Sequence, residues 1–173
     1  QTWLVAYTSD RGPAQFYSWD RQTKKATFMF IAQPKLENLQ LAGMKPVVIP
    51  ARDGLKLCGY LTLPVGLPAK NLPLVLFVHG GPWARDNWGY NPYAQWFANR
   101  GYACLQVNYR GSTGYGKNFL NAGDKQWGDS HGDYGPCRDG AAREFDGDGA
   151  GLGDIHGGGK RESGADVPVA GLE

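Results

Sequence analysis

A continuous apolar run that ends in a glycine-rich turn constrains the fold of this chain more than any other feature. Leu72 to Val78 contains no polar residue, and His79-Gly80-Gly81-Pro82 follows it directly. A strand with one face in water alternates apolar and polar residues, whereas a continuous apolar run indicates a strand covered on both faces. The run therefore predicts a buried strand in a mostly parallel sheet.

A helix and a second buried strand are predicted after this turn. Pro92 to Arg100 has the pattern of a short amphipathic helix that begins at its proline, with Tyr93, Trp96 and Phe97 at helical spacing. A glycine ends this helix, and Tyr102 to Asn108 predicts another buried strand. Strand, glycine-rich loop, helix and strand form a βαβ unit, so this part of the chain is predicted to be of the α/β class.

Two further sets of strands are predicted upstream. Pro46 to Pro50 and Leu55 to Pro64 are apolar stretches joined through Asp53-Gly54, a strong tight-turn signal, and they predict a hairpin. Residues 1 to about 40 predict an antiparallel meander, which is one blade of a β-propeller and cannot bury both of its faces alone. Its strands are Trp3 to Thr8, Ala14 to Trp19 and Ala26 to Ile31.

The turn from His79 to Pro82 carries the most specific chemical signal. Small residues directly after a buried strand let backbone N–H groups turn toward an oxygen atom of a substrate. In an acyl-transfer enzyme such donors form an oxyanion hole, which stabilises the negative charge of a tetrahedral intermediate. Gly81 is the first candidate donor and Gly80 the second. The alternative is a purely structural turn that needs glycine for a positive φ.

Longer motifs surround the predicted βαβ unit. They run from Phe77 to Trp83 and from Asn108 to Gly116, and related runs precede them at Met44 to Val47, Ala51 to Leu55 and Gly59 to Pro64. Together they resemble the prolyl oligopeptidase family, especially its acylaminoacyl-peptidase and dipeptidyl-peptidase-like branch. The resemblance implies a last β-propeller blade in residues 1–40 and part of an α/β-hydrolase domain in residues 41–127. It also implies a serine-type peptidase, a hydrolase that cleaves short peptides or acyl-amino acids with a Ser-Asp-His triad.

The nucleophile of such a peptidase is not predicted in this chain. Gly128-Asp129-Ser130-His131-Gly132 matches the Gly-x-Ser-x-Gly spelling of a nucleophile elbow. An elbow needs a buried strand before it and a helix after it, and the residues around Ser130 favour neither. His156 lies among glycines, so no scaffold would hold it beside Ser130 with Asp146 or Asp154. We therefore expect an inactive fragment of a longer peptidase.

Composition changes abruptly near Gly128. Residues 128–173 hold 13 of the 26 glycines and none of the six tryptophans, and they carry 10 acidic against 4 basic residues. Residues 128–173 have too little apolar surface to offset the entropy lost on ordering, so this tail is predicted to be disordered. A reading-frame error or an unrelated fused end would also produce such an abrupt change. Asp146 to Gly149 resembles the start of a calcium loop, but Ala150 and Gly157 occupy later ligand positions, so no metal site is predicted.

Other sequence patterns limit the kinds of partner and cofactor that are expected. Basic residues in 1–127 are scattered singly, which indicates a solvated surface rather than a nucleic-acid site. No apolar run approaches the ~20 residues that cross a bilayer, so a soluble protein without a membrane partner is expected. The cysteines form no Cys-x-x-Cys pair, so Cys58 and Cys104 are predicted to be buried free thiols, and no cofactor is expected. Because the chain begins at Gln1, we expect an upstream segment, and the compartment stays open between cytoplasmic and exported.

Two other functions stay open from the sequence. A lipase or carboxylesterase of the same fold also uses His-Gly-Gly, although the blade-like strands and the motif from Asn108 to Gly116 favour the peptidase. A non-catalytic interaction module would leave a sheet edge and an apolar face uncovered, which promotes aggregation.

Overall fold

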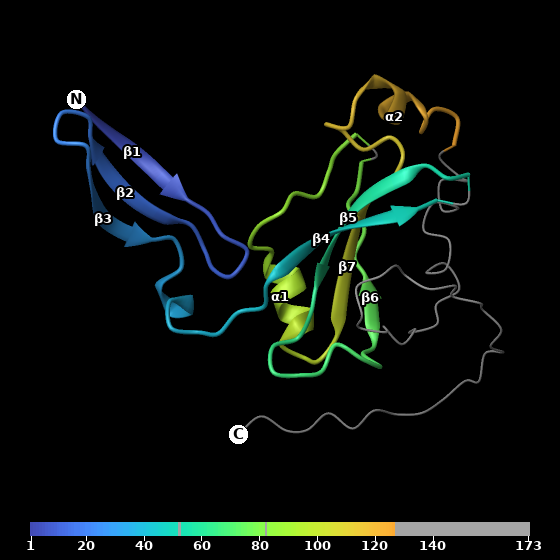
Figure 1. The fold of residues 1–173 in the computed structure, drawn as a ribbon, viewed down its shortest axis with the longest axis horizontal. Coiled ribbons are helices and arrows are strands. Elements are labelled where there is room, and N and C mark those ends of the chain that lie inside the picture. Colours follow the sequence, from blue (N-terminus) through green and yellow to red (C-terminus); the bar gives the residue numbers. More distant parts are fainter. Residues whose placement is uncertain (52, 82, 127–173) are drawn as a thin grey trace.

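The structure is a computed structural model that describes residues 1–51, 53–81 and 83–126. Within these ranges the chain forms two separate sheets, an N-terminal one and a central one, with α-helices beside the second (Figure 1). The linker between the sheets contains a 3-10 helix at Pro34–Leu36. The predicted elbow at Ser130 and the predicted disordered tail, residues 128–173, lie outside the described residues.

The N-terminal sheet is the predicted meander. Strands β1 (Thr2–Tyr7), β2 (Gln15–Asp20) and β3 (Lys25–Ile31) pair antiparallel in chain order, which confirms the expected strands. Asp20 fixes the turn after β2, because its carboxylate accepts hydrogen bonds from the N–H groups of Gln22 and Thr23 at 2.7 and 3.1 Å. These backbone hydrogen bonds lower the pKa of Asp20.

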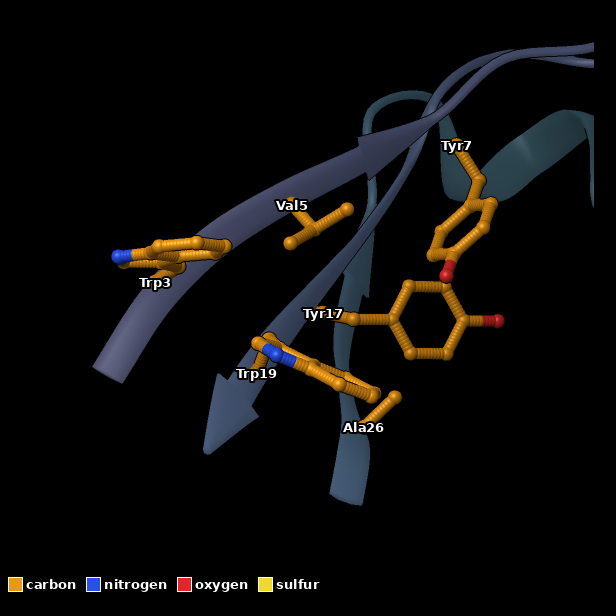
Figure 2. A pocket seen from close by; sticks show the side chains of 6 residues that line it. All are labelled: Trp3, Val5, Tyr7, Tyr17, Trp19 and Ala26. Carbon is orange, nitrogen blue, oxygen red and sulfur yellow. The ribbon is translucent and has the colours of Figure 1, made fainter. Parts of the chain in front are cut away.

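Both faces of this sheet present apolar side chains to solvent. On one face, aromatic residues from β1 and β2 surround a shallow hollow (Figure 2). On the other face, Phe16 and Phe30 stack across the strands with their ring centroids 4.7 Å apart, and Phe30 is still 48% exposed. A three-stranded sheet with two uncovered apolar faces is not self-sufficient in water. The residues around the hollow are Trp3, Val5, Tyr7, Tyr17, Trp19 and Ala26.

The central sheet has the strand order β4-β5-β7-β6. Strands β4 (Met44–Pro50) and β5 (Lys56–Thr62) form the predicted hairpin, with Gly54 at φ +84° in the turn. Strands β6 (Leu74–Leu76) and β7 (Ala103–Asn108) run parallel, as the predicted βαβ unit requires. The expectation of a mostly parallel sheet is wrong for the described residues, because β5 pairs antiparallel with both β4 and β7.

The two faces of the central sheet differ in polarity. On one face, Leu105 of β7 joins the hydrophobic core with Leu57 and Leu61 of β5. On the other face, Gln106 and Asn108 are buried although both are polar. The predicted second buried strand is confirmed, and its polar side chains must find hydrogen-bond partners inside the protein.

Strand β6 is shorter and more exposed than its sequence predicts. Only Leu74–Leu76 pairs as a strand, and all three residues are half-buried. Among the described residues β6 pairs with β7 alone, so it forms the edge of the sheet (Figure 1). The apolar run therefore predicts the strand correctly and its burial wrongly.

Helix α1 (Pro92–Ala98) begins and ends close to the predicted bounds. The side chain of Asn91 accepts from two backbone N–H groups of the first turn, so an N-cap as well as the proline starts the helix. The buried residues of α1 are Ala94 and Ala98, whereas Tyr93 and Trp96 are 58% and 52% exposed. The aromatic stripe therefore does not mark the buried face. Helix α2 (Lys117–Asn121) was not expected.

Hydrogen bonds join the two sheets. Asp10, in the β1–β2 loop, accepts a bond from the Met44 N–H at 2.8 Å through its carboxylate. Gln95 of α1 bonds to both backbone groups of Ala42, at 2.9 and 2.7 Å. Tyr90 donates its backbone N–H to the Ser9 carbonyl oxygen at 2.8 Å. The start of the central sheet is thus tied to both the first sheet and α1.

Candidate active-site loops

Two loops leave the central sheet at the carboxyl ends of neighbouring strands. The first loop, residues 77–86, follows β6, and the second loop, residues 109–116, follows β7. Because β6 and β7 are neighbouring parallel strands, their carboxyl ends lie side by side, which is where open α/β sheets bind ligands. The two longest motifs of the sequence therefore meet in one place.

Gly80 and Gly81 are exposed on the first loop. Gly81 has φ +139°, and a Cβ atom there would lie 2.8 Å from the Trp83 nitrogen and 3.1 Å from the Ala84 nitrogen. A Cβ on Gly80 would meet nothing within 4 Å. Among the described residues no backbone hydrogen bond uses the N–H of either glycine. Gly81 is therefore required by backbone geometry, while both N–H groups can serve a ligand.

His79 braces the first loop against the second. Its Nδ1 lies 2.9 Å from the carbonyl oxygen of Gly80 and its Nε2 lies 2.9 Å from Oγ of Ser112. A carbonyl oxygen can only accept, so Nδ1 carries a proton, and in the neutral ring the Ser112 hydroxyl donates to Nε2. The ring also stacks on Tyr109 at 4.5 Å, and the Tyr109 hydroxyl donates to the His79 carbonyl oxygen at 3.0 Å.

The pair of His79 and Ser112 resembles a catalytic dyad in composition but not in accessibility. Ser112 is 0% exposed, so its hydroxyl cannot reach a substrate carbonyl. In a triad the second ring nitrogen bonds to a carboxylate that orients the base, whereas here Nδ1 bonds to the adjacent Gly80 carbonyl. This pair fixes the loop and does not supply a nucleophile.

Asn108 fastens the far end of the first loop to β7. Its Oδ1 accepts from the Asp86 backbone N–H at 2.8 Å, and its Nδ2 donates to the Asp86 carbonyl oxygen at 3.2 Å. The same Nδ2 donates to the Tyr115 hydroxyl of the second loop at 2.8 Å. One fully buried amide therefore holds both loops on the sheet.

Arg85 lies between the loops. It stacks over the Tyr115 ring at 4.8 Å and donates to the Tyr115 hydroxyl at 3.3 Å. Gly114 has φ +88°, and a Cβ atom there would overlap the Arg85 guanidinium. Thr113 donates its backbone N–H to the Ala84 carbonyl oxygen at 2.9 Å. The glycine of the Ser-Thr-Gly-Tyr run thus leaves room for Arg85.

Burial controls the acidity of two groups near these loops. It raises the pKa of the Cys104 thiol to about 12, and the neighbouring Asp86 acts in the same direction. Burial also raises the pKa of Tyr115 to about 12, with a further contribution from Tyr60. Cys104 is a buried free thiol, as predicted, while Cys58 is free but only half-buried. The Cys104 sulfur is structural, because a thiol this weakly acidic is a poor nucleophile.

An exposed ion pair links the second loop to the β4–β5 turn. Arg110 lies 3.1 Å from Oδ2 of Asp53. Its hydrogen bond, followed by that from the Leu55 N–H, lowers the pKa of Asp53. The hairpin and the second loop, far apart in the sequence, thus contact each other.

The sequence predicted Gly80 and Gly81 as site residues, and the structure places both on the exposed first loop. Sequence reasoning missed the side chains that hold this loop, chiefly Asn108, Ser112 and Asp86. The one signal for them was the presence of polar residues in and after a strand predicted to be buried. Ser130 lies outside the described residues, among which no His, Cys, Asp or Glu cluster could hold a metal ion. Across the same ranges, no helix has the length and apolarity to span a bilayer.

Known proteins are similar to this chain in sequence. The model of the prolyl oligopeptidase family matches residues 88–133. Dipeptidyl aminopeptidase BIII of Pseudoxanthomonas mexicana is 52% identical over 134 residues, which cover 73% of this chain and 19% of that protein. Dipeptidyl peptidase family member 6 of Caenorhabditis elegans is 38% identical over 148 residues, covering 73% and 20%. The chain spans about a fifth of the length of these curated relatives.

A solved structure shares the fold. The puromycin-hydrolyzing peptidase of Mycobacterium tuberculosis superposes with a TM-score of 0.61 at 27% identity, over 73% of this chain and 20% of the peptidase chain. The acylaminoacyl peptidase of Pyrococcus horikoshii superposes with a TM-score of 0.55 at 25% identity, over 69% and 19%. The described sheets therefore occur together in known peptidases.

Proposed function

Since this chain belongs to the prolyl oligopeptidase family, we propose that it supplies the oxyanion-binding loop of a serine-type peptidase. Gly81 is the main donor and Gly80 the second. The observation that carries the proposal is the first loop itself. His79 holds it through the Gly80 carbonyl oxygen, Asn108 holds it through the Asp86 N–H, and both glycines stay exposed. A rigid, pre-oriented donor is what oxyanion stabilisation requires.

The chemical role of this loop follows from charge development. When a nucleophile attacks a peptide carbonyl, the oxygen gains negative charge, and an N–H already directed at it strengthens its hydrogen bond in the transition state. Loss of one such donor typically raises the barrier by about 3 kcal/mol. The network around His79 keeps the loop from relaxing when the charge appears, so little reorganisation opposes the reaction.

The nucleophile of the proposed peptidase lies outside residues 1–126. The serines in this range are Ser9, Ser18 and Ser112, and Ser112 alone bonds to a histidine but is fully buried. Ser130 matches an elbow in spelling, but the sequence around it lacks the apolar run and the helical pattern that predict an elbow's strand and helix. We therefore propose that the chain by itself is inactive and that the Ser-Asp-His triad belongs to a longer protein.

The proposed substrates are short peptides or acyl-amino acids. The names of the relatives support this class, since they include a dipeptidyl aminopeptidase, a puromycin-hydrolyzing peptidase and an acylaminoacyl peptidase. The same names favour a peptidase over the lipase or carboxylesterase that the His-Gly-Gly turn alone leaves open.

We also propose that residues 1–40 are the last β-propeller blade and residues 41–127 the first part of the hydrolase domain. The support is the N-terminal sheet, which exposes large apolar side chains on both faces. Trp3 and Tyr7 lie on one face and Leu4 on the other, and all three are between 53% and 65% exposed. Neighbouring blades would cover both faces. This uncovered surface also weighs against a free-standing interaction module.

A chimera tests the proposed function. Residues 1–126 replace the matched segment of the Pseudoxanthomonas mexicana relative, and hydrolysis of a dipeptidyl p-nitroanilide is measured alongside hydrolysis of an acetyl-amino acid p-nitroanilide. We expect turnover of at least one substrate. Alanine keeps the backbone N–H, but the strained φ and the close Cβ contact would displace this donor, so Gly81→Ala should lose about 10²-fold in kcat with KM nearly unchanged. A folded chimera that hydrolyses a carboxylic ester but neither amide would contradict the peptidase assignment.

A further inference from the structure

Asp86 ends the first loop with a carboxyl group that points into the protein rather than to solvent. Its Oδ1 accepts a hydrogen bond from Nε2 of Gln106 at 2.8 Å. Gln106 lies on the polar face of β7 and is only 1% exposed. The amide that meets the carboxyl is therefore closed off from water on its own side.

The two remaining oxygen atoms of this pair are both buried without a hydrogen-bond partner in the described part of the chain. They are Oδ2 of Asp86 and Oε1 of Gln106. An ionised carboxylate and an amide carbonyl oxygen are both acceptors, so they cannot satisfy each other. A carboxyl and a carboxamide are planar groups of the same shape, and one shared proton allows two parallel hydrogen bonds between them.

The side chain that donates to the Asp86 carboxyl is the neutral amide of Gln106, not a cation. Arg85 is adjacent, but its Nε donates to the Asp86 backbone oxygen at 3.4 Å and another nitrogen bonds to Tyr115. A positive charge on His79, at the start of the first loop, would lower the pKa of Asp86, but the effect of burial is larger. On β5, β7 and the second loop, the titratable groups Cys58, Tyr60, Cys104, Tyr109 and Tyr115 carry no positive charge in any protonation state. The cations on these elements are Lys56, which is exposed, and Arg110, which pairs with Asp53. Burial raises the pKa of Asp86.

We propose that Asp86 is a neutral carboxylic acid in the folded protein, and that its Oδ2–H donates to Oε1 of Gln106. The proton satisfies both buried oxygens at once and joins the end of the first loop to β7 by a pair of side-chain hydrogen bonds. Together with the two bonds from Asn108 to the Asp86 backbone, this pair positions the loop that carries Gly80 and Gly81. Asp86 is thus a positioning residue for the oxyanion-binding loop. This role rests on the proposed function, whereas the protonated pair of Asp86 and Gln106 does not.

The substitution Asp86→Asn is a matched test of this assignment. Asparagine keeps the shape of the acid, accepts from Gln106 through its oxygen and donates to Oε1 of Gln106 through its amide. It therefore reproduces the protonated pair at every pH. Asp86→Ala removes both hydrogen bonds and serves as the disruptive control.

The pH dependence has a definite sign. Since the folded state keeps this proton to a higher pH than the unfolded state, the contribution of the pair to stability is complete below the pKa of an unfolded aspartate. It is lost as the pH rises through the pKa of Asp86 in the folded chain. Asp86→Asn should therefore gain stability relative to the natural chain as the pH rises.

The experiment uses the full 173-residue chain labelled with 13C at the aspartate carboxyl carbons. The carboxyl resonance that disappears in Asp86→Asn identifies Asp86, and its titration midpoint is compared with those of Asp20 and Asp53, whose pKa values are lowered. We expect Asp86 to titrate last of these three, and urea unfolding midpoints of the natural chain and Asp86→Asn to diverge with rising pH. A midpoint for Asp86 in the range of an exposed aspartate, or parallel unfolding profiles, would overturn the proposal.

Discussion

Replacement of Gly81 by alanine tests the geometry of the first loop. Gly81 has φ +139°, where an L side chain is strained by about 1–3 kcal/mol. The added Cβ would also lie 2.8 Å from a backbone nitrogen, which cannot rotate away as a side chain could, and such overpacking costs about 1–3 kcal/mol. Alanine restricts the unfolded chain, which returns about 0.4–1 kcal/mol. We expect Gly81→Ala to lower the free energy of unfolding by about 1–5.5 kcal/mol.

Gly80→Ala is the matched control for this substitution. It adds the same methyl group one residue earlier, at a position that lacks a positive φ and has nothing within 4 Å of the new Cβ. Its effect on the free energy of unfolding should stay within about 0.5 kcal/mol. Urea unfolding measures both, and a typical slope places the midpoint of Gly81→Ala about 0.5 M or more below that of Gly80→Ala. Equal midpoints would refute the account of the loop.

Three other measurements probe the surrounding network. Asn108→Ala should lower the free energy of unfolding by about 2–4 kcal/mol in urea, because it removes the partner of the part-buried Asp86 N–H and a second bond to the Asp86 carbonyl oxygen; an effect below about 1 kcal/mol would contradict this. Cys104 should resist iodoacetamide at pH 8 until the chain unfolds, while half-buried Cys58 reacts earlier, as peptide mass spectrometry can show. Because Arg110 lowers the pKa of Asp53, their ion pair stabilises the fold at any pH above the pKa of Asp53 in the unfolded chain. This stabilisation is lost as the pH falls through the pKa of Asp53 in the folded chain. Urea midpoints of Asp53→Asn at low salt should show no such acid-dependent loss.

Local sequence chemistry predicts the elements of this fold well. The β4–β5 hairpin follows from Asp53-Gly54, since Gly54 adopts the positive φ that the turn needs. Helix α1 follows from its proline start. Both depend on residues adjacent in the chain, so neither requires knowledge of the rest of the protein.

Burial is predicted less well, because it depends on what lies beside each element. The apolar run after Leu72 suggests a covered strand, yet β6 is an edge strand with half-buried residues. In α1 the small residues Ala94 and Ala98 face the sheet, since they allow close approach, and large Tyr93 stays exposed. Hydrophobic size alone does not identify the inner face.

The support of the candidate site could not be predicted, because its contacts cross between loops. His79 and Ser112 are 33 residues apart, and Asp86 and Asn108 are 22 apart. No periodic pattern links such pairs. Glycine composition predicts where an oxyanion loop begins, whereas the polar side chains that fix it become recognisable only when β6 and β7 are placed side by side.

The central claim is that the first loop stabilises an oxyanion, and fluorophosphonate labelling tests it most directly, because the probe forms a tetrahedral adduct at the catalytic serine. The 173-residue chain, the chimera with the Pseudoxanthomonas mexicana relative, and its Gly81→Ala and Gly80→Ala variants are compared. We predict no labelling of the chain, rapid labelling of the chimera, labelling slower by about 10²-fold in Gly81→Ala, and a smaller effect in Gly80→Ala. Stoichiometric labelling of the chain at Ser130, or equal labelling rates for the chimera and its Gly81→Ala variant, would contradict the account.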